Sequence, residues 1–258
     1  MLPRAKKSYG QNFLVDGSVV GKIVSAAGIL PGDVVLEVGP GTGTLTEALV
    51  AAGARVVAVE ADHDLIPALR EKFGDAIALV ERDIFEYLSV RDLAILERPY
   101  KVIANIPYNI TSPLLHHFLT AKNPPSRMVL MVQREVADRI VATPPDMSLL
   151  SVVCQAYADV SRVANVPRGA FRPVPRVDSA VVRFDLRHLE DVEDLESVIR
   201  LAKAGFCSRR KQLHRNVSDA GLASSGIVKD ALTSFGLPAT ARAENLTVHN
   251  WIRLSRLI

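Results

Sequence analysis

The stretch DVVLEVGPGTG, residues 33–43, decides the fold class of this chain. Its first half is a short apolar run that predicts a buried strand, and its second half is rich in glycine. Glycines directly after a first strand let the backbone turn sharply and approach a ligand closely. Because position 44 is Thr, the spacing G-x-G-x-G is not the complete dinucleotide-binding fingerprint, and the loop contains no Lys for a P-loop.

Strands and helices alternate on both sides of this stretch. Further apolar runs that predict strands cover residues 54–60, 76–81, 100–104 and 127–132. Segments with helical spacing follow the strands, at residues 44–52, 62–73, 111–120 and 134–141. Buried strands separated by helices predict an α/β fold, a parallel sheet with helices on both faces. Edge strands are expected at residues 150–158, 161–166 and 179–185, with a proline-rich loop at 171–176.

The composition changes near residue 186, and the remaining chain is expected to be helical. The candidate helices cover residues 195–206, 210–220, 227–235 and 248–257. We therefore predict a sheet-containing domain over residues 1–185 and a small all-helical domain over residues 186–258.

Composition and charge exclude several classes of protein. Apolar residues make up 48% of the 258 residues and charged residues 23%, which excludes a disordered chain. We expect no membrane span and no secretory signal, because no apolar run is long enough for either. Two cysteines, Cys154 and Cys207, are too few for a disulfide framework and lie in no metal-ligand spacing, so we expect no metal site and a cytoplasmic protein.

Two carboxylates follow strands that end at the same edge of the predicted sheet. Glu60 ends the second strand about 20 residues after Gly39, where a carboxylate can accept hydrogen bonds from ribose hydroxyls. Asp83 follows the third strand and is placed to accept a hydrogen bond from an adenine amino group. A solvated glutamate at a strand end is the alternative for Glu60. Together with the glycine loop, these residues predict a cofactor that contains adenosine.

Asn105-Ile106-Pro107-Tyr108 follows the fourth strand, at the same edge of the sheet. It belongs to a series of motifs that also includes GQNFL (10–14), VQREVA (132–137), FRPVPRVDSA (171–180) and FCSRRK (206–211). In these motifs the chain resembles the ribosomal RNA adenine N6,N6-dimethyltransferases, from residue 7 to about residue 256. The resemblance implies a Rossmann-like methyltransferase sheet, S-adenosylmethionine as cofactor and N6 of adenine as target.

The residue types of the tetrapeptide suit this chemistry. An exocyclic adenine amine is a poor nucleophile because its lone pair is delocalised into the ring. The side-chain oxygen of Asn105 and a backbone carbonyl aimed by Pro107 can accept both N–H bonds and localise the lone pair. Tyr108 is expected to stack on the extruded base, and so is Phe171, for which a packing role is the alternative.

The resemblance also implies which residues bind the cofactor. They are Gln11, Asn12, Leu14, Gly39, Gly41, Glu60, Asp83 and Asn105. From the residues alone, segment 11–14 would be a capping region before a helix that starts near Asp16.

Basic side chains form two clusters without acids. The first cluster contains Arg4, Lys6 and Lys7. The second lies within residues 200–216 and includes Arg209, Arg210 and Lys211. Such clusters can neutralise RNA phosphates, although most charge runs are solvated helix faces. The formal net charge of +3 hides the second cluster, because the acidic segment 185–196 nearly cancels it.

Taken together, these features predict an enzyme that dimethylates two adjacent adenosines near the 3′ end of 16S rRNA. The expected partner is that RNA within an immature small ribosomal subunit, bound by a monomer. The alternatives are a macrolide-resistance-type methyltransferase of 23S rRNA and an RNA-binding assembly or transcription factor without catalysis. A nicotinamide dehydrogenase is disfavoured by the glycine spacing. The loop at 142–148 lacks the Tyr-Gly pair that is frequent in the family, so RNA contacts there are not carried over.

Overall fold

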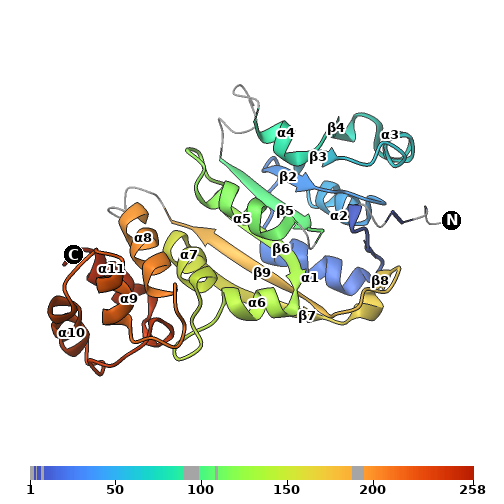
Figure 1. The fold of residues 1–258 in the computed structure, drawn as a ribbon. Helices are drawn as coiled ribbons and strands as arrows, with labels where there is room; N and C mark the ends of the chain where they lie inside the picture. Colours follow the sequence, from blue (N-terminus) through green and yellow to red (C-terminus); the bar gives the residue numbers. More distant parts are fainter. Residues whose placement is uncertain (1–2, 4, 7–8, 90–98, 108–109, 188–194) are drawn as a thin grey trace. The chain divides into compact units, whose positions relative to one another are not determined.

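The computed structural model describes residues 3, 5–6, 9–89, 99–107, 110–187 and 195–258 (Figure 1). The contacts within the chain define two compact units. The first comprises residues 1–137 and 161–186, and the second comprises residues 138–160 and 187–258. The second unit thus includes residues 138–160, which lie before the boundary expected at residue 186.

A seven-stranded sheet forms the centre of the first unit. Its strand order is β4 (Ile77–Glu81), β3 (Arg55–Glu60), β2 (Val34–Val38), β5 (Tyr100–Asn105), β6 (Arg127–Gln133), β9 (Ser179–Leu186) and β7 (Ala158–Val166). The first five strands are parallel to one another, and β9 pairs with β6 in the antiparallel direction. The predicted α/β fold with a largely parallel sheet is confirmed.

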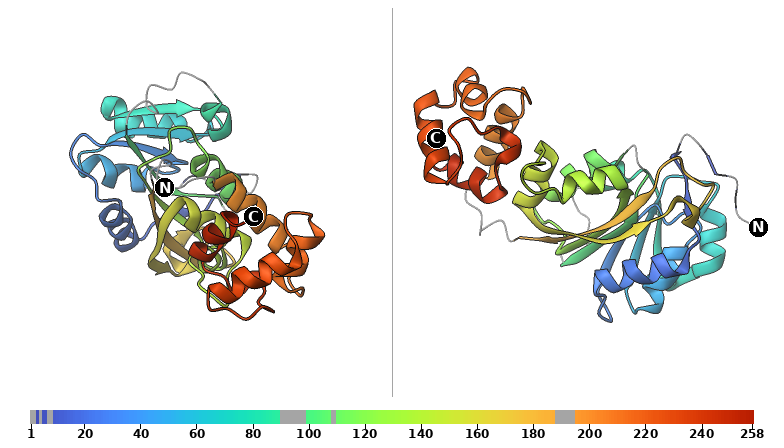
Figure 2. Two further views of the ribbon diagram at one scale, coloured as in Figure 1. Left: turned by 90° about the vertical axis from the view of Figure 1, so that its left-hand side faces the viewer. Right: turned by 90° about the horizontal axis from the view of Figure 1, so that it is seen from below.

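Helices cover both faces of this sheet (Figure 2). They are α1 (Gly17–Ala27), α2 (Thr44–Ala51), α3 (Ile66–Phe73), α4 (Ile84–Leu88), α5 (Thr111–Leu119) and α6 (Arg134–Ile140). In the right-hand view the blue α1 and α2 lie on one side of the sheet and the green α5 lies on the other. Val35, Ile103 and Val129 from the central strands are completely buried with Ile23 of α1, because strands covered on both faces exclude water. Among the described residues, no helix is long and apolar enough to cross a membrane.

The parallel register brings the carboxyl ends of four strands together. Val38 of β2 lies opposite Val59 of β3 and opposite Ala104 of β5. Asn105, the last residue of β5, lies opposite Met131 of β6. Residues that follow these strands therefore meet at one edge of the sheet, which is where ligands bind in open α/β folds.

The N-terminal segment reaches this edge through a short ladder. Residues 13–14 form β1 (Phe13–Leu14), which pairs in the antiparallel direction with β8 (Phe171–Arg172). The capping residue of α1 is Asp16, whose carboxylate accepts hydrogen bonds from the backbone N–H groups of Ser18 at 2.8 Å and Val19 at 3.4 Å. Segment 13–14 is thus a strand, and the cap expected there lies further along the chain.

The second unit is helical. It contains α7 (Leu149–Tyr157), α8 (Leu195–Gly205), α9 (Leu213–Asp219), α10 (Ser225–Ser234) and α11 (Val248–Ser255). The edge strand expected at 150–158 is wrong, because this segment is α7. Ser148 caps the helix, and its side chain and that of Ser151 each accept a hydrogen bond from the backbone N–H of the other residue. In a strand, these N–H groups would bond to a neighbouring strand instead. Cys154 is buried within this helix.

The core of this unit depends on the absence of a side chain at Gly205. A Cβ atom there would lie 2.4 Å from Cη2 of Trp251 and 2.8 Å from Cδ1 of Leu213. The Trp251 side chain is completely buried and has no free space to move into. We expect Gly205→Ala to lower the free energy of unfolding by about 1–3 kcal/mol, which outweighs the helix propensity of alanine.

Urea denaturation measures this effect, and Gly226→Ala is the matched control. Gly226 also lies in a helix, but the nearest atom to a Cβ there is Oγ of Ser224 at 3.9 Å. The control should be as stable as the parent or slightly more stable. Equal stability of the two variants would contradict the packing argument.

Candidate active site

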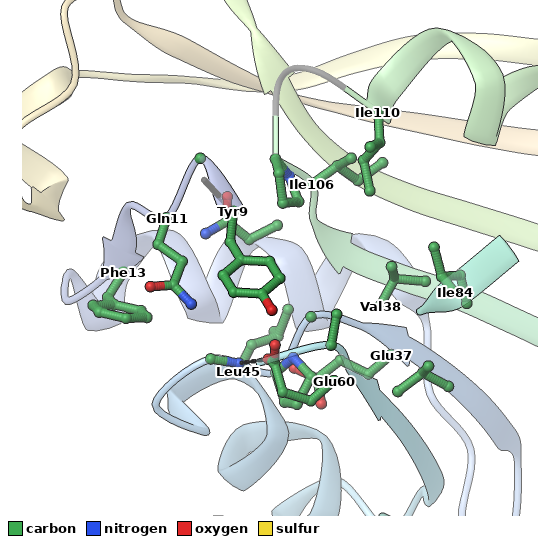
Figure 3. Close-up of a pocket in the computed structure, with 18 of the residues that line it drawn as sticks. Tyr9, Gln11, Phe13, Glu37, Val38, Leu45, Glu60, Ile84, Ile106 and Ile110 are labelled. Carbon is green, nitrogen blue, oxygen red and sulfur yellow. Dashed lines mark hydrogen bonds between the residues drawn. The ribbon is translucent and has the colours of Figure 1, made fainter. Parts of the chain in front are cut away.

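A pocket of about 330 Å³ opens at the carboxyl edge of the sheet (Figure 3). Its walls come from the N-terminal segment 9–14, from the glycine loop after β2, and from the residues that follow β3, β4 and β5. All of these elements belong to the first unit. The pocket therefore lies where the strand-end motifs were expected to meet.

Three glycines shape the loop after β2, and two of them, Gly39 and Gly41, line the pocket. Gly39, Gly41 and Gly43 have φ values of 69°, 59° and 75°, a region that side chains with a Cβ rarely adopt. A Cβ on Gly43 would lie 2.4 Å from the ring of Phe73, so α2 and α3 approach each other closely at this position. A Cβ on Gly39 would meet no atom within 4 Å, so the space in front of Gly39 is free for a ligand.

Glu60 closes one side of the pocket and is only 6% exposed. Its Oε2 accepts a hydrogen bond from the N–H of Gly41 at 3.1 Å, and its Oε1 accepts one from the N–H of Asp62 at 2.9 Å. Burial raises the pKa of Glu60, while these backbone donors act in the opposite direction. A carboxylate oxygen has two lone pairs, so both oxygens can still accept a further hydrogen bond from a hydroxyl group.

Glu37 lies beside Glu60 in the pocket wall and was not among the expected site residues (Figure 3). It is 1% exposed, and among the described residues its Oε2 has no hydrogen-bond partner. Burial raises the pKa of Glu37 to about 8, and the neighbouring Glu60 acts in the same direction. A buried oxygen without a partner is costly, so this atom is suited to a ligand that donates a hydrogen bond. The signal in the sequence was an acid within the otherwise apolar run 34–38.

Ion pairs hold the N-terminal segment against the end of β3. The ammonium of Lys6 lies 2.5 Å from carboxylate oxygens of both Asp62 and Asp64. The side chain of Gln11 donates to Asp62 at 2.7 Å and accepts from the backbone N–H of Lys6 at 2.7 Å. Burial works against the ionisation of Asp62, but these donors outweigh it and the pKa of Asp62 lies below its usual value.

Asn105 is held by this same segment. Its Nδ2 donates a hydrogen bond to the backbone carbonyl of Asn12 at 3.1 Å. Among the described residues no donor bonds to its Oδ1, so this oxygen can accept a hydrogen bond from a ligand. Ile106 donates its backbone N–H to the carbonyl of Met131 at 3.3 Å, which fixes the start of the tetrapeptide against β6.

The structure brings nearly all the expected cofactor and catalytic residues to this pocket. Those that line it are Gln11, Asn12, Leu14, Gly39, Gly41, Glu60, Asp83, Asn105 and Pro107. Asp83 also caps α4 by accepting from the N–H of Phe85 at 2.8 Å. Phe171 is 1% exposed within the main core and is not part of the described lining, so its position matches the packing alternative. Tyr108 lies outside the described residues.

Apolar residues complete the pocket and were not expected from the sequence. They include Val38, Leu45, Ile84, Ile106 and Ile110, together with the ring of Tyr9 (Figure 3). These residues come from β2, α2, α4 and the segments around them, so no single periodic pattern in the sequence brings them together and only the fold reveals them. Together they give the pocket an apolar wall suited to a planar base, alongside the two glutamates.

Comparison with known proteins identifies the family. A family model described as ribosomal RNA adenine dimethylase matches residues 3–258. The chain belongs to the ribosomal RNA adenine dimethylase family. Ribosomal RNA small subunit methyltransferase A of Geobacter metallireducens is 44% identical over 262 residues, which cover 98% of this chain and 95% of the relative. The protein of the same name from Dehalococcoides mccartyi (strain CBDB1) is 42% identical over 255 residues, which cover 97% of this chain and 87% of the relative.

Two solved structures resemble this dimethylase over almost its full length. A dimethyladenosine transferase from Plasmodium falciparum superposes with a TM-score of 0.77 at 25% identity, covering 94% of this chain and 95% of its own. The 23S rRNA methyltransferase ErmE has a TM-score of 0.80 at 28% identity, covering 95% and 99%. The predicted family, the Rossmann-like methyltransferase fold and the predicted class of enzyme, an rRNA adenine dimethyltransferase, are confirmed.

The pocket of this dimethylase fits a methyl donor of the S-adenosylmethionine type. The free space at Gly39 admits an extended ligand, and the unpartnered Oε2 of Glu37 suits a cationic hydrogen-bond donor. Glu60 and Asp83 add acceptors at the ends of β3 and β4. These features agree with a nucleoside that carries a positively charged chain.

The expected RNA-binding residues of the dimethylase differ in their surroundings. Lys6 is engaged by two carboxylates, and Lys211 lies 3.0 Å from Asp219. Arg209 and Arg210 are exposed and have no ion pair within the described part of the chain. Arg4 and Lys7 lie outside the described residues. Among the four described members of the set, the two arginines are thus the side chains without an ion pair and are available to phosphates.

Proposed function

We propose that this dimethylase transfers methyl groups to N6 of two adjacent adenosines near the 3′ end of small-subunit rRNA. The position of Asn105 supports this activity most directly. Its Nδ2 is bound by the carbonyl of Asn12, so its Oδ1 is left to accept a hydrogen bond from the target amine. The small subunit is favoured because relatives named for it are 42–44% identical, whereas the 23S enzyme is 28% identical.

The protein acts on the amine by accepting its hydrogens. Oδ1 of Asn105 and a backbone carbonyl at residues 106–107 accept the two N–H bonds, which localises the lone pair on N6 and stabilises the positive charge that develops. The N–C bond forms as the S–C bond of the donor breaks, and the resulting ammonium loses its proton to water. Asn105 remains neutral, since this proton is acidic enough to leave without a strong base.

S-adenosylmethionine supplies the methyl group as an activated sulfonium. We assign its ribose to Glu60 and its adenine to Asp83 and the apolar wall, because these acceptors lie at the ends of β3 and β4. Glu37 and the glycine loop then face the cationic chain. Gln11, Asn12 and Leu14 form the opposite side of the pocket.

The decisive experiment compares RNA substrates directly. The purified protein is incubated with labelled S-adenosylmethionine and with either under-methylated small subunits or large-subunit RNA, and the nucleosides are then separated. We expect dimethyladenosine in the small-subunit RNA alone. Label in the large-subunit RNA would favour the macrolide-resistance type, and binding without transfer would favour an assembly factor.

We further propose that the second unit binds RNA through Arg209 and Arg210. Replacing both with alanine should weaken RNA binding and flatten its salt dependence by about 1.4 in log–log slope, because each lost phosphate contact in single-stranded RNA contributes about 0.7. Lys211→Ala should have a smaller effect, since Asp219 already neutralises this ammonium. Filter binding at several salt concentrations measures the slopes, with Lys229→Ala on α10 as control.

We place the physiological partner in an immature small subunit, bound by a monomer in the cytoplasm. This proposal requires the two target bases to be accessible in the incomplete subunit. If the variant without Arg209 and Arg210 shows an unchanged salt dependence of RNA binding and normal methyl transfer, RNA binding is assigned to the first unit.

A further inference from the structure

A second pocket lies at the same edge of the sheet and is assigned to no part of the reaction above. It has a volume of about 460 Å³ and lies entirely within the first unit. Its lining comes from the end of β6 and the start of α6, from the connection between β7 and β8, and from the proline-rich loop before β9. The lining residues are Gln133, Arg134, Glu135, Arg168, Arg176, Val177 and Asp178.

The charges of this pocket favour an anion. Three guanidinium groups face two carboxylates, and one of those carboxylates is already engaged. Asp178 accepts from the backbone N–H of Arg168 at 3.1 Å and lies 3.5 Å from the guanidinium of Arg134. Within the described part of the chain, the guanidinium groups of Arg168 and Arg176 have no carboxylate within ion-pair distance. Both side chains are exposed, so their charges are available to a ligand.

The backbone around Asp178 keeps the pocket in shape. The N–H of Arg134 donates to the carbonyl of Asp178 at 3.0 Å, and Ser179 pairs with Gln133 across β6 and β9. Asp178 therefore connects the two sides of the pocket, which explains why a carboxylate lies among the arginines. The pocket is held by main-chain bonds and does not depend on its occupant.

The pocket lies beside the catalytic asparagine. Asn105 lies opposite Met131, and Gln133 follows two residues later on β6. Given the usual strand spacing and rise, the two backbones are separated by about 8 Å. Arg168 is also only three residues before Phe171, whose strand pairs with the N-terminal segment of the active site. A nucleic-acid strand that presents a base to Asn105 therefore passes this pocket within one or two nucleotides.

Exposed apolar side chains border the arginines. Val177 is 44% exposed and Val174 is 53% exposed, both in the loop that contains Arg176. Arginine recognises phosphate through paired, charge-assisted hydrogen bonds, while apolar side chains contact sugars and bases. Guanidinium groups alternating with apolar residues at an open pocket match a sugar–phosphate backbone better than a small free anion.

We propose that this second pocket binds a phosphodiester group of the substrate RNA next to the target adenosine. The inference rests on the proposed function, because it places the same RNA strand across the active site. Arg168 and Arg176 bind the phosphate. Asp178, paired with Arg134, holds these two arginines in position. By fixing the neighbouring nucleotide, the pocket holds the flipped base at the catalytic asparagine.

The test uses a variant with Arg168→Ala and Arg176→Ala in the full chain. We expect KM for small-subunit RNA to rise about 5- to 20-fold, with kcat within about twofold and cofactor affinity unchanged, because phosphate contacts position the substrate without taking part in the chemistry. The log–log salt slope should flatten by about 0.7 to 1.4. Arg176→Lys should restore part of the affinity, since it keeps the charge but loses the paired geometry.

The matched control is Arg55→Ala, at the amino end of β3 on the opposite edge of the sheet. It removes an exposed arginine of the same unit and should leave KM and the salt slope as in the parent. Equal RNA affinity and equal slopes for the control and the double variant would overturn the proposal. A weakened affinity with an unchanged slope would also overturn it, because a lost phosphate contact must change the slope. If the parent protein transfers no methyl group, the proposed function fails, while the binding assays still decide whether the pocket holds RNA.

Discussion

Replacing Asn105 with alanine is expected to lower kcat for methyl transfer about 100- to 1,000-fold, the range found when a single charge-stabilising side chain is removed from an active site. Alanine has no Oδ1, so nothing replaces the acceptor that localises the lone pair of the target amine. The variant also loses the hydrogen bond from Nδ2 to the carbonyl of Asn12. Single-turnover transfer of a labelled methyl group measures the loss apart from product release.

Two further measurements separate chemistry from folding in this variant. Cofactor affinity should change by less than about tenfold, because the other lining residues remain and one hydrogen bond contributes about 1 kcal/mol. Asn165→Ala is the matched control, since this exposed side chain on β7 bonds only to Arg162 at 3.1 Å among the hydrogen bonds of the described residues. The control should keep full activity. Activity in Asn105→Ala equal to that of the control would contradict the proposed mechanism.

Glu37→Gln should stabilise the cofactor-free protein in mildly alkaline solution. The carboxyl of Glu37 keeps its proton up to about pH 8 in the folded protein, whereas the ordinary pKa of the side chain is 4.5. Between these values the folded state binds more protons than the unfolded chain, so the free energy of unfolding falls as the pH rises. The loss is about 1.4 kcal/mol per pH unit and amounts to at most about 5 kcal/mol by pH 8. Glutamine does not ionise, so the variant keeps this part of the free energy of unfolding as the pH rises.

Urea denaturation at intervals between pH 5 and pH 8 measures the two slopes. Glu47→Gln makes the same chemical change at a surface position that is 66% exposed, so the difference between the variants isolates the contribution of the buried site. We expect the stability of Glu37→Gln to exceed that of the parent by a margin that grows with pH. A margin that stays constant across this range would show that Glu37 is ionised throughout.

The parallel sheet could be predicted from local sequence patterns. The runs at β2, β3, β4 and β5 are apolar and bounded by glycine or polar residues, so their limits were predicted to within one residue. Once such strands are parallel, their carboxyl ends must share an edge, and this geometry placed Glu60 and Asn105 in one pocket. The chemistry of the pocket could therefore be predicted from residues close to the strand ends.

Features that depend on contacts between distant parts of the chain could not be predicted from local patterns. The run LLSVVCQAY at 149–157 suits a strand or a buried helix equally, and only the cap at Ser148 decides for the helix. Lys6 belongs to an acid-free basic cluster in the sequence, but the fold places it against Asp62 and Asp64. Likewise, the apolar run around residue 37 indicates that its carboxyl is buried but not that it lines a pocket, because the other lining residues come from separate parts of the chain.

The pairing of β1 with β8 has a consequence for the synthesis of the protein. Phe13 lies opposite Arg172, so the ladder that fixes residues 13–14 cannot form until the ribosome has translated past this position. Contacts between such distant parts of a chain form late, because a long loop must close first. Gln11 and Asn12 can reach Asp62 and Asn105 in a shorter nascent chain, but β1 is fixed only once β8 has been synthesised. This side of the pocket is therefore the last to be completed.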